Sequence, residues 1–245
     1  MTNSSSLAVR PPKTAKLKMN ARELSKIDSL QRSMKTRFAR VGEQGRLVRY
    51  LGKDFLVYKN VFWPFKDSLP LARNFTVRKG ECVLDVGTGS GILAVLAAYK
   101  GAGRVVALDI NTSAVKAAWE NARRHGLSSI IEVRTSDMFD ALKKEEKFDV
   151  ILTNPPFRNK AARNVREAAQ WDTGFSFHER FFSEIKKYLK PRSRIYMAQA
   201  NYGDIAFMKR LARKAGFRTK RVGTHAMPKG DPRVFYAFEL SLISR

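Results

Sequence analysis

Residues 82–99 read CVLDVGTGSGILAVLAAY, and this stretch decides the fold. Val83 to Val86 is an apolar run typical of a buried strand, and Ile92 to Tyr99 is an apolar run that predicts a helix. Only glycines and small polar residues lie between them, so the backbone can turn tightly and approach a ligand closely. The pattern predicts the first half of a βαβ unit.

The three glycines of this turn, Gly87, Gly89 and Gly91, occupy alternate positions. The dinucleotide fingerprint G-x-G-x-x-G has its third glycine one residue later, which argues mildly against NAD. By itself the loop is also compatible with a strand-to-helix turn that binds nothing.

Two acidic residues follow the next two predicted strands. Asp109 ends the strand that starts at Arg104, and a carboxylate at this position of a parallel sheet can accept hydrogen bonds from both hydroxyls of a ribose. Residues 111–113 can cap a helix that runs to about His125. A third strand, 130–133, precedes Asp137, which either contacts the amine of an adenine or occupies a turn or helix cap. If an adenine binds there, Met138 or Phe139 can cover a face of its ring.

A second motif closes the apolar run FDVILTNPPF at residues 148–157. With the glycine loop it resembles the class I S-adenosylmethionine-dependent methyltransferases that carry an (Asn/Asp)-Pro-Pro-(Tyr/Phe) motif. The resemblance covers 83–157 closely and the rest of the chain loosely. It implies a Rossmann-like α/β fold, with helices on both faces of a seven-stranded sheet. It also implies an S-adenosylmethionine site formed by Asp85, Gly87, Thr88, Gly89, Gly91, Asp109, Ile110, Asp137, Met138 and Asn154. The catalytic residues that it implies are Asn154, Pro155, Pro156 and Phe157.

The chemistry of amine methylation explains why the motif has these residues. An exocyclic amine on a purine, or the amide of glutamine, delocalises its lone pair and is a poor nucleophile. If the Asn154 side-chain oxygen and the Pro155 carbonyl each accept one N–H, the lone pair is held out of plane toward the methyl group. Phe157 can stack on the flat acceptor. The alternative is a strand followed by a proline-rich turn without catalytic function.

Charge is distributed unevenly along the chain. The formal net charge is +25, but residues 81–157 carry 9 basic and 10 acidic side chains. The flanks, 1–80 and 158–245, carry 18 basic against 5 acidic and 20 basic against 7 acidic. We therefore expect a polyanion partner, RNA or a ribonucleoprotein ahead of DNA, although a solvated basic surface is the alternative.

The segment before residue 61 is predicted to be a basic appendage to a catalytic domain at 61–245. Residues 1–22 are interpreted as a disordered basic tail rather than a transit peptide. Asn20 and Glu23 predict a capping box for an amphipathic basic helix that contains Leu24, Ile27, Leu30, Met34 and Phe38, and that packs on the core rather than on a membrane. A β-hairpin is expected to turn around residues 52–54. In residues 61–68, VFWPFKDS, cofactor contact and aromatic core packing are equally expected.

The segment after Phe157 is basic and then aromatic, and is predicted to be a substrate lid. Its candidate phosphate ligands are Arg158, Lys160, Arg163 and Arg166, and Trp171 or Phe175 can stack on an unpaired base. Solvation and core packing are the alternatives. The remaining predicted elements are a helix at about 178–189, a strand at 194–199, a helix at 204–215 and two strands near 217–222 and 234–242.

Other classes of protein find little support in the sequence. The single cysteine, Cys82, allows no internal disulfide, the three histidines are scattered, and no metal site is expected. The longest apolar stretch is too short to cross a bilayer, so a cytoplasmic protein without membrane contact is expected.

The leading hypothesis is N-methylation of adenine N6, or guanine N2, in an RNA such as rRNA or tRNA. One alternative is a protein-glutamine N5-methyltransferase that acts on a translation factor or ribosomal protein, and another is a non-catalytic RNA-binding module. A small activating protein subunit, which some relatives require, is left open.

Overall fold

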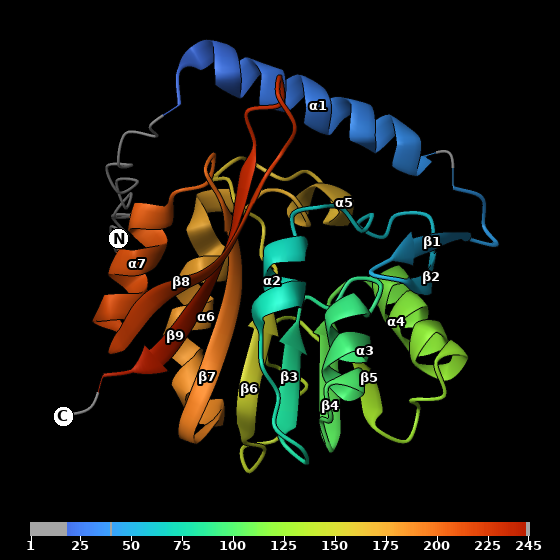
Figure 1. Ribbon diagram of the computed structural model, residues 1–245, viewed down its shortest axis with the longest axis vertical. Coiled ribbons are helices and arrows are strands. Elements are labelled where there is room, and N and C mark those ends of the chain that lie inside the picture. Colours follow the sequence, from blue (N-terminus) through green and yellow to red (C-terminus); the bar gives the residue numbers. More distant parts are fainter. Residues whose placement is uncertain (1–18, 40, 244–245) are drawn as a thin grey trace, which may run out of the picture.

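The computed structural model describes residues 19–39 and 41–243, except the side chains of 34–39, 165 and 166. A seven-stranded sheet forms its centre, with strand order β5-β4-β3-β6-β7-β9-β8 (Figure 1). The strands of this sheet are β3 (Cys82–Val86), β4 (Arg104–Asp109), β5 (Ile131–Thr135), β6 (Phe148–Thr153), β7 (Leu189–Ala200), β8 (Phe217–Ala226) and β9 (Val234–Leu242). Strands β3 to β7 pair in parallel, and β9 pairs antiparallel with both β7 and β8. The predicted seven-stranded sheet of an α/β fold is confirmed, and β8 and β9 form an antiparallel pair at one edge.

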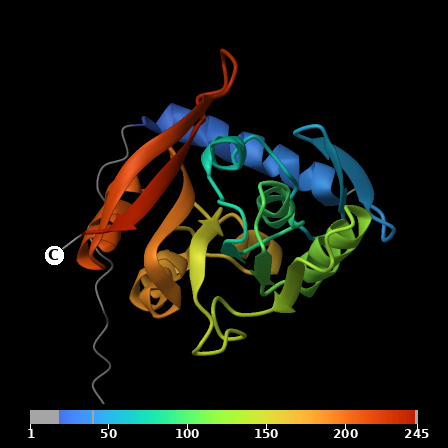
Figure 2. The ribbon, with the colours of Figure 1, turned by 60° about the horizontal axis from the view of Figure 1, so that its bottom comes forward.

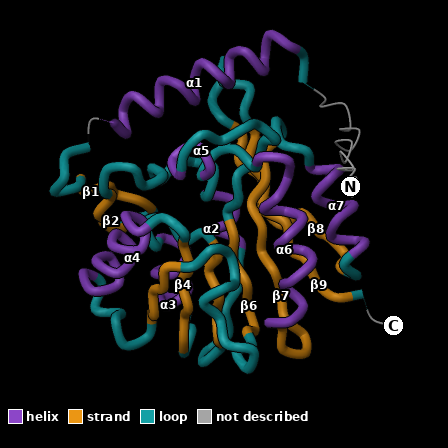
Figure 3. Tube along the Cα trace, turned by 180° about the vertical axis from the view of Figure 1, so that it is seen from behind, coloured by secondary structure: helices purple, strands orange, loops and turns teal. Residues whose placement is uncertain are grey.

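Helices cover both faces of this sheet, as Figure 3 shows from behind. The helical segments are α1 (Ala21–Ala39), α2 (Leu69–Asn74), α3 (Ile92–Tyr99), α4 (Thr112–Arg124), α5 (Val165–Ala168), η1 (Thr173–Phe175), α6 (Ser176–Glu184), η2 (Ile185–Tyr188) and α7 (Ile205–Lys214). Helices α2, α3 and α4 share one hydrophobic cluster with the sheet, and α6 and α7 share a second cluster on its other face. Both faces of the central strands are therefore buried, which explains why β3 and β6 read as continuous apolar runs rather than alternating ones.

The N-terminal part adds one helix and one hairpin to this core. The capping box is confirmed, because the Asn20 side chain accepts the Glu23 backbone N–H at 2.9 Å and the Glu23 side chain accepts the Asn20 backbone N–H at 3.0 Å. Helix α1 lies across the sheet edge where the parallel strands end, and Ile27 is completely buried in the core (Figure 1). Met34 and Phe38 have side chains outside the described part of the chain, as do residues 1–18.

The hairpin consists of β1 (Arg46–Tyr50) and β2 (Lys53–Val57) and packs beside α4 (Figure 2). Its turn is Leu51-Gly52, one residue earlier than expected, because both residues adopt left-handed φ of 49° and 78°. That pair forms a two-residue turn, so Lys53 belongs to β2. The fully buried Asn121 of α4 fixes the hairpin to the core, since its side-chain amide exchanges hydrogen bonds of 2.7 and 2.8 Å with the backbone of Leu56.

Two predicted boundaries differ from the structure because the strands contain irregularities. Strand β7 begins at Leu189 and not at Arg194, but its pairing with β6 is interrupted until Arg194, where the regular ladder starts. The predicted helix at 178–189 accordingly begins at Ser176 and changes to a 3₁₀ turn at Ile185. Strand β8 continues four residues past Val222, because a bulge before Gly223 disrupts the alternation from which its end was predicted.

Among the described helices, none is both long and apolar enough for a membrane span.

Candidate active site

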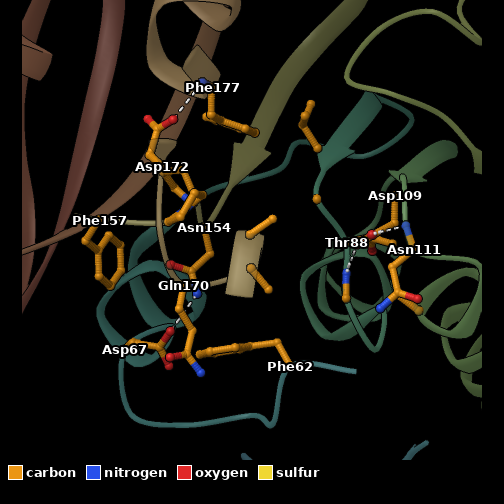
Figure 4. A pocket seen from close by; sticks show the side chains of 18 of the residues that line it. Phe62, Asp67, Thr88, Asp109, Asn111, Asn154, Phe157, Gln170, Asp172 and Phe177 are labelled. Carbon is orange, nitrogen blue, oxygen red and sulfur yellow. Dashed lines mark hydrogen bonds between the residues drawn. The ribbon is translucent and has the colours of Figure 1, made fainter. Parts of the chain in front are cut away.

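A cavity of about 550 Å³ opens at the carboxyl edge of the parallel strands, where α/β sheets commonly bind ligands. Its wall contains the loop after β3, the ends of β4 and β6, the segment before α2 and the loop that follows Phe157. Gln31 of α1 contributes to its roof. In Figure 4 Thr88, Asp109 and Asn111 lie on one side of the cavity, and Asn154, Asp67 and Gln170 lie on the other.

The glycine loop provides an open cradle on the first side. Gly87 and Gly89 line the cavity with left-handed φ of 72° and 57°, and a Cβ atom added to either would meet no atom within 4 Å. A side chain at either position would project into the space where a ligand can approach the backbone. The loop therefore has the shape that close backbone contact with a cofactor requires.

Two members of the predicted cofactor set lie beneath this loop and do not line the cavity. Asp85 is completely buried and accepts a 2.7 Å hydrogen bond from the Thr88 hydroxyl, and burial raises the pKa of this carboxyl to about 7. Gly91 packs against α4, where an added Cβ would come within 2.9 Å of the Ala118 Cα. Both residues fix the conformation of the loop, and their predicted part in cofactor binding stays a prediction.

Asp109 lies at the end of β4 and lines the cavity beside Ile110, which is exposed. Its two oxygens accept backbone N–H groups from Gly89, at 2.8 Å, and from Asn111, at 2.9 Å. Burial raises the pKa of this carboxyl. A carboxylate has about four lone-pair sites, so each oxygen can still accept a ligand hydroxyl.

Asp137 and Met138 also line the cavity. The Asp137 carboxylate pairs with Arg180 of α6 at 3.0 Å, so its orientation depends on an element that the sequence did not connect with it. Phe139 does not cover a ligand ring, because it is buried in the core between Phe181 and Tyr188.

The Asn154 side chain is held in a single orientation. Its amide nitrogen donates to the Asp67 carboxylate at 2.9 Å and to the Ser68 hydroxyl at 3.2 Å. Its amide oxygen is buried and has no hydrogen-bond partner in the described part of the protein. A buried acceptor without a partner costs about 1–3 kcal/mol, which a ligand donor in the cavity would recover. The Asn154 oxygen is thus a preformed, unsatisfied acceptor at the cavity.

Asp67 and Ser68 belong to the segment 61–68, whose role the sequence left open. Asp67 is 4% exposed, and burial raises the pKa of its carboxyl. Phe62, Pro64, Phe65, Asp67 and Ser68 all line the cavity, while Val61 packs in a separate hydrophobic cluster. The segment therefore forms cavity wall and packs in the core. The signal that points to Asp67 is the one acidic residue in a segment that contains three aromatic residues.

The rest of the motif forms the neighbouring wall. Pro155, Pro156 and Phe157 line the cavity. The Phe157 ring is 7% exposed and contacts Tyr202 edge-on, with ring centroids 5.9 Å apart, and Phe235, with centroids 6.4 Å apart. This packing holds the ring in place at the cavity surface.

The loop after Phe157 covers the cavity, but its first basic residues are paired within the chain. Arg158 forms an ion pair with Asp28 of α1, and Lys160 contacts both oxygens of the same carboxylate at 2.8 and 2.9 Å. The sequence predicted that both would contact phosphates, whereas the structure shows them fastening α1 to the loop. Asp28 and Arg158 lie 130 positions apart, so no local sequence pattern could indicate these pairs.

The other predicted residues of this loop have varied positions. Arg163 is exposed and lies 3.5 Å from Glu167, and the Arg166 side chain is outside the described part. Trp171 lines the cavity, and its stacking on a base stays a prediction. Phe175 does not, because it is buried against Phe207 with ring centroids 4.3 Å apart.

Sequence reasoning missed two further residues at this site. Gln170 lines the cavity and is 8% exposed, yet its amide oxygen has no partner among the described residues. The buried Asp172 carboxylate accepts the backbone N–H of Phe177 at 2.8 Å (Figure 4). Its other oxygen lies 2.5 Å from Nδ1 of His178. These two contacts fix the loop against α6. No metal-binding group of three His, Cys, Asp or Glu side chains occurs in the described ranges.

Comparison with known proteins agrees with this geometry. The family model described as "methyltransferase small domain" matches residues 66–211. A putative protein N5-glutamine methyltransferase of Methanocaldococcus jannaschii is 32% identical over 161 residues, which cover 63% of this chain and 80% of that protein. A ribosomal protein L11 methyltransferase of Desulforamulus reducens is 46% identical over 78 residues, 32% of this chain, and the chain spans only 25% of its length.

Among solved structures, the T. thermophilus 16S rRNA N2 G1207 methyltransferase in complex with AdoMet and guanosine has a similar fold, with a TM-score of 0.58 and 21% identity. The match covers 81% of this chain and 50% of that one. The family model covers more than half of the chain, and the glycine cradle and Asp109 fit an S-adenosylmethionine. The chain therefore belongs to the methyltransferase small domain family and is an S-adenosylmethionine-dependent methyltransferase.

Proposed function

We propose that this enzyme methylates a planar amine nitrogen that is held by Asn154. The observation that carries the proposal is the buried Asn154 oxygen without a partner, on an amide whose nitrogen is occupied by Asp67 and Ser68. An ionised carboxylate only accepts hydrogen bonds, so Asp67 makes the Asn154 nitrogen face it and the oxygen face the cavity. An amine N–H is a donor that this oxygen can accept.

Orientation of the amine is the main contribution of the protein to the reaction. We propose that Asn154 and the backbone carbonyl of Pro155 each accept one N–H, so that the nitrogen lone pair lies perpendicular to the acceptor plane. Phe157 and Pro156 form the wall against which the planar group rests. Bound S-adenosylmethionine supplies an electrophilic methyl group. Nitrogen attack needs no prior deprotonation, and the extra proton can leave to solvent afterwards.

Cofactor binding is assigned to the opposite side of the cavity. We propose that the Asp109 carboxylate accepts the ribose hydroxyls, while Gly87, Thr88 and Gly89 give close backbone contact. Asp137 is proposed to accept from the adenine amine, and Met138 to cover the ring. Arg180 holds Asp137 in position through their ion pair.

For the acceptor we favour an exocyclic amine of a base in RNA, with adenine N6 ahead of guanine N2. The net charge of +25, concentrated outside the neutral cofactor segment, supports a polyanionic substrate. Trp171 at the cavity wall offers a surface on which an unpaired base can stack. In a structured RNA the base must be unpaired or flipped to reach Asn154.

A glutamine side chain in a protein is the second candidate acceptor. Its amide is planar and carries two N–H groups, so the same Asn154 geometry suits it. The observation that favours it is the relative from Methanocaldococcus jannaschii, which is named for N5-glutamine methylation and is 32% identical. Such a substrate has no phosphate backbone and predicts weak salt dependence.

One labelling experiment distinguishes these acceptors. The purified enzyme is incubated with tritium-labelled S-adenosylmethionine and a cell extract, which is then divided between nuclease and protease treatment. Label that nuclease releases as N6-methyladenosine or N2-methylguanosine supports the RNA proposal. Label that only protease releases, as N5-methylglutamine, assigns the enzyme to protein substrates instead.

A further inference from the structure

We infer that the exposed side of α7, together with Arg221 of β8, is the surface that binds the phosphate backbone of the RNA substrate. This inference rests on the proposed function for its substrate class. We call this surface the α7 basic face, and its members are Lys209, Arg210, Arg213, Lys214 and Arg221, all of which are exposed.

The spacing of the four helical residues places them on one side of α7. Positions 209, 210, 213 and 214 recur at intervals of three and four residues, which is one face of a helix. The opposite face is buried through Phe207, Met208 and Ala212. Helix α7 contains no acidic residue, and Asp204 before it is the N-cap, accepting the Phe207 N–H at 2.8 Å. The exposed face is therefore uniformly cationic.

Arg221 adds to this face from the neighbouring strand. The Lys209 ammonium lies over the Phe238 ring at 5.2 Å, and the Arg221 guanidinium lies over the Tyr236 ring at 5.6 Å. These two rings are neighbours on β9, with centroids 6.3 Å apart. The two cations thus lie above adjacent aromatic groups, and the charge continues from the helix across the sheet edge.

None of the five cations forms an ion pair with another described residue. The far edge of the sheet behaves differently, because Arg134 of β5 pairs with Glu146 at 2.8 Å and with Glu132 at 2.7 Å. Arg104 also pairs with both of these glutamates. Among the described residues, Arg104 and Arg134 are thus neutralised near the β5 edge of the sheet, whereas the cations of the α7 basic face, at the opposite β8 edge, form no ion pair. Figure 1 shows these two edges of the sheet. Unpaired clustered charge of one sign is what polyanion binding requires.

The segment that leads into α7 lies beside the active site. Tyr202 lines the cavity, and at Gly203 an added Cβ would come within 2.6 Å of the Phe157 carbonyl, so the two residues before Asp204 pack on the catalytic motif. Ten helical residues extend about 15 Å, enough to run beside several phosphates. An RNA whose acceptor base enters the cavity can therefore follow α7 outward. Asp28 already pairs with Arg158 and Lys160, whereas the cations of the α7 basic face form no ion pair with another described residue.

The test measures RNA binding without catalysis. A fluorescein-labelled RNA of about 20 nucleotides is titrated with protein between about 50 and 200 mM KCl, and anisotropy gives the Kd at each salt concentration. The variant is Arg213→Gln with Lys214→Gln, since glutamine keeps a high helix propensity. The control is Lys143→Gln with Lys144→Gln, which removes the same charge from another exposed site.

For the α7 variant we expect the slope of log Kd against log salt to decrease by about 1.4, if each residue contacts one phosphate of a single strand. The control should bind as the wild type does. Equal losses in the two variants, or no loss in either, would contradict a specific RNA surface. RNA binding that is absent from the wild type, with an acidic protein bound through α7 instead, would also overturn the inference. Loss of methyl transfer plays no part in this readout, so failure of the proposed function would be detected separately.

Discussion

Asp67 is expected to control methyl transfer without touching the transferred group. In Asp67→Ala, Asn154 loses the charged partner that keeps its amide nitrogen away from the cavity. The amide can then rotate and place its N–H group opposite the N–H group of the substrate, where two donors cannot form a hydrogen bond. A hydrogen bond to a charged group contributes about 1.5–3 kcal/mol. If that difference is lost from the transition state, kcat falls by about 10- to 150-fold.

The assay is single-turnover transfer of tritium from S-adenosylmethionine at saturating substrate, with thermal unfolding as the check of folding. Asp67→Asn should retain part of the activity, because its amide oxygen can still accept from Asn154 at 2.9 Å. Asp54→Ala, which changes a half-exposed carboxylate of the hairpin, is the control. Since burial raises the pKa of Asp67, acid inactivation should begin at higher pH than for an ordinary aspartate and should be absent from Asp67→Asn. Full activity of folded Asp67→Ala would refute this role.

Three further predictions concern the loop, the sheet edge and the lid. Gly91→Val should lower the melting temperature measured by calorimetry, because φ is +81° and the added Cβ would meet the Ala118 Cα at 2.9 Å, at a cost of about 1–3 kcal/mol. A variant as stable as the wild type would contradict this packing. Pairing with Arg134 lowers the pKa of Glu146 from 4.5 to about 2. The ionised carboxylate therefore adds up to about 3 kcal/mol to the free energy of unfolding above pH 4.5, and this contribution is lost as the pH falls through 2. The free energy of unfolding of Glu146→Gln should depend less on pH in that window. Gln170→Leu should raise KM for the acceptor substrate several-fold and leave the Kd for S-adenosylmethionine unchanged, whereas equal changes in both would argue against an acceptor contact.

Local patterns predicted most of the fold, because its elements have regular periodicity. Strand β3 and helix α3 follow directly from their apolar runs, and the capping box of α1 depends on two residues three positions apart. The errors occurred where backbone irregularities interrupt the period, as in the bulge before Gly223 and the interrupted start of β7. A bulge adds a residue without a change in composition, so the pattern gives no sign of it.

The candidate site was predictable where one segment contains both the motif and its chemistry, as at Asn154. Long-range pairings were not predictable. Asp67 lies 87 positions before Asn154, and Asp28 lies 130 positions before Arg158. Nothing in the local sequence of Arg158 distinguishes an arginine that binds phosphate from one that binds a distant carboxylate. The structure reassigned the basic surface because ion pairing depends on tertiary contacts.

The central claim is that the unpartnered oxygen of Asn154 holds the amine for methylation. The most direct measurement compares single-turnover methyl transfer by Asn154→Ala and wild type, with S-adenosylmethionine and RNA affinities measured in parallel. We expect transfer to fall by at least about 100-fold, while RNA affinity stays the same and the cofactor still binds. Wild-type transfer by a folded Asn154→Ala protein would contradict the account.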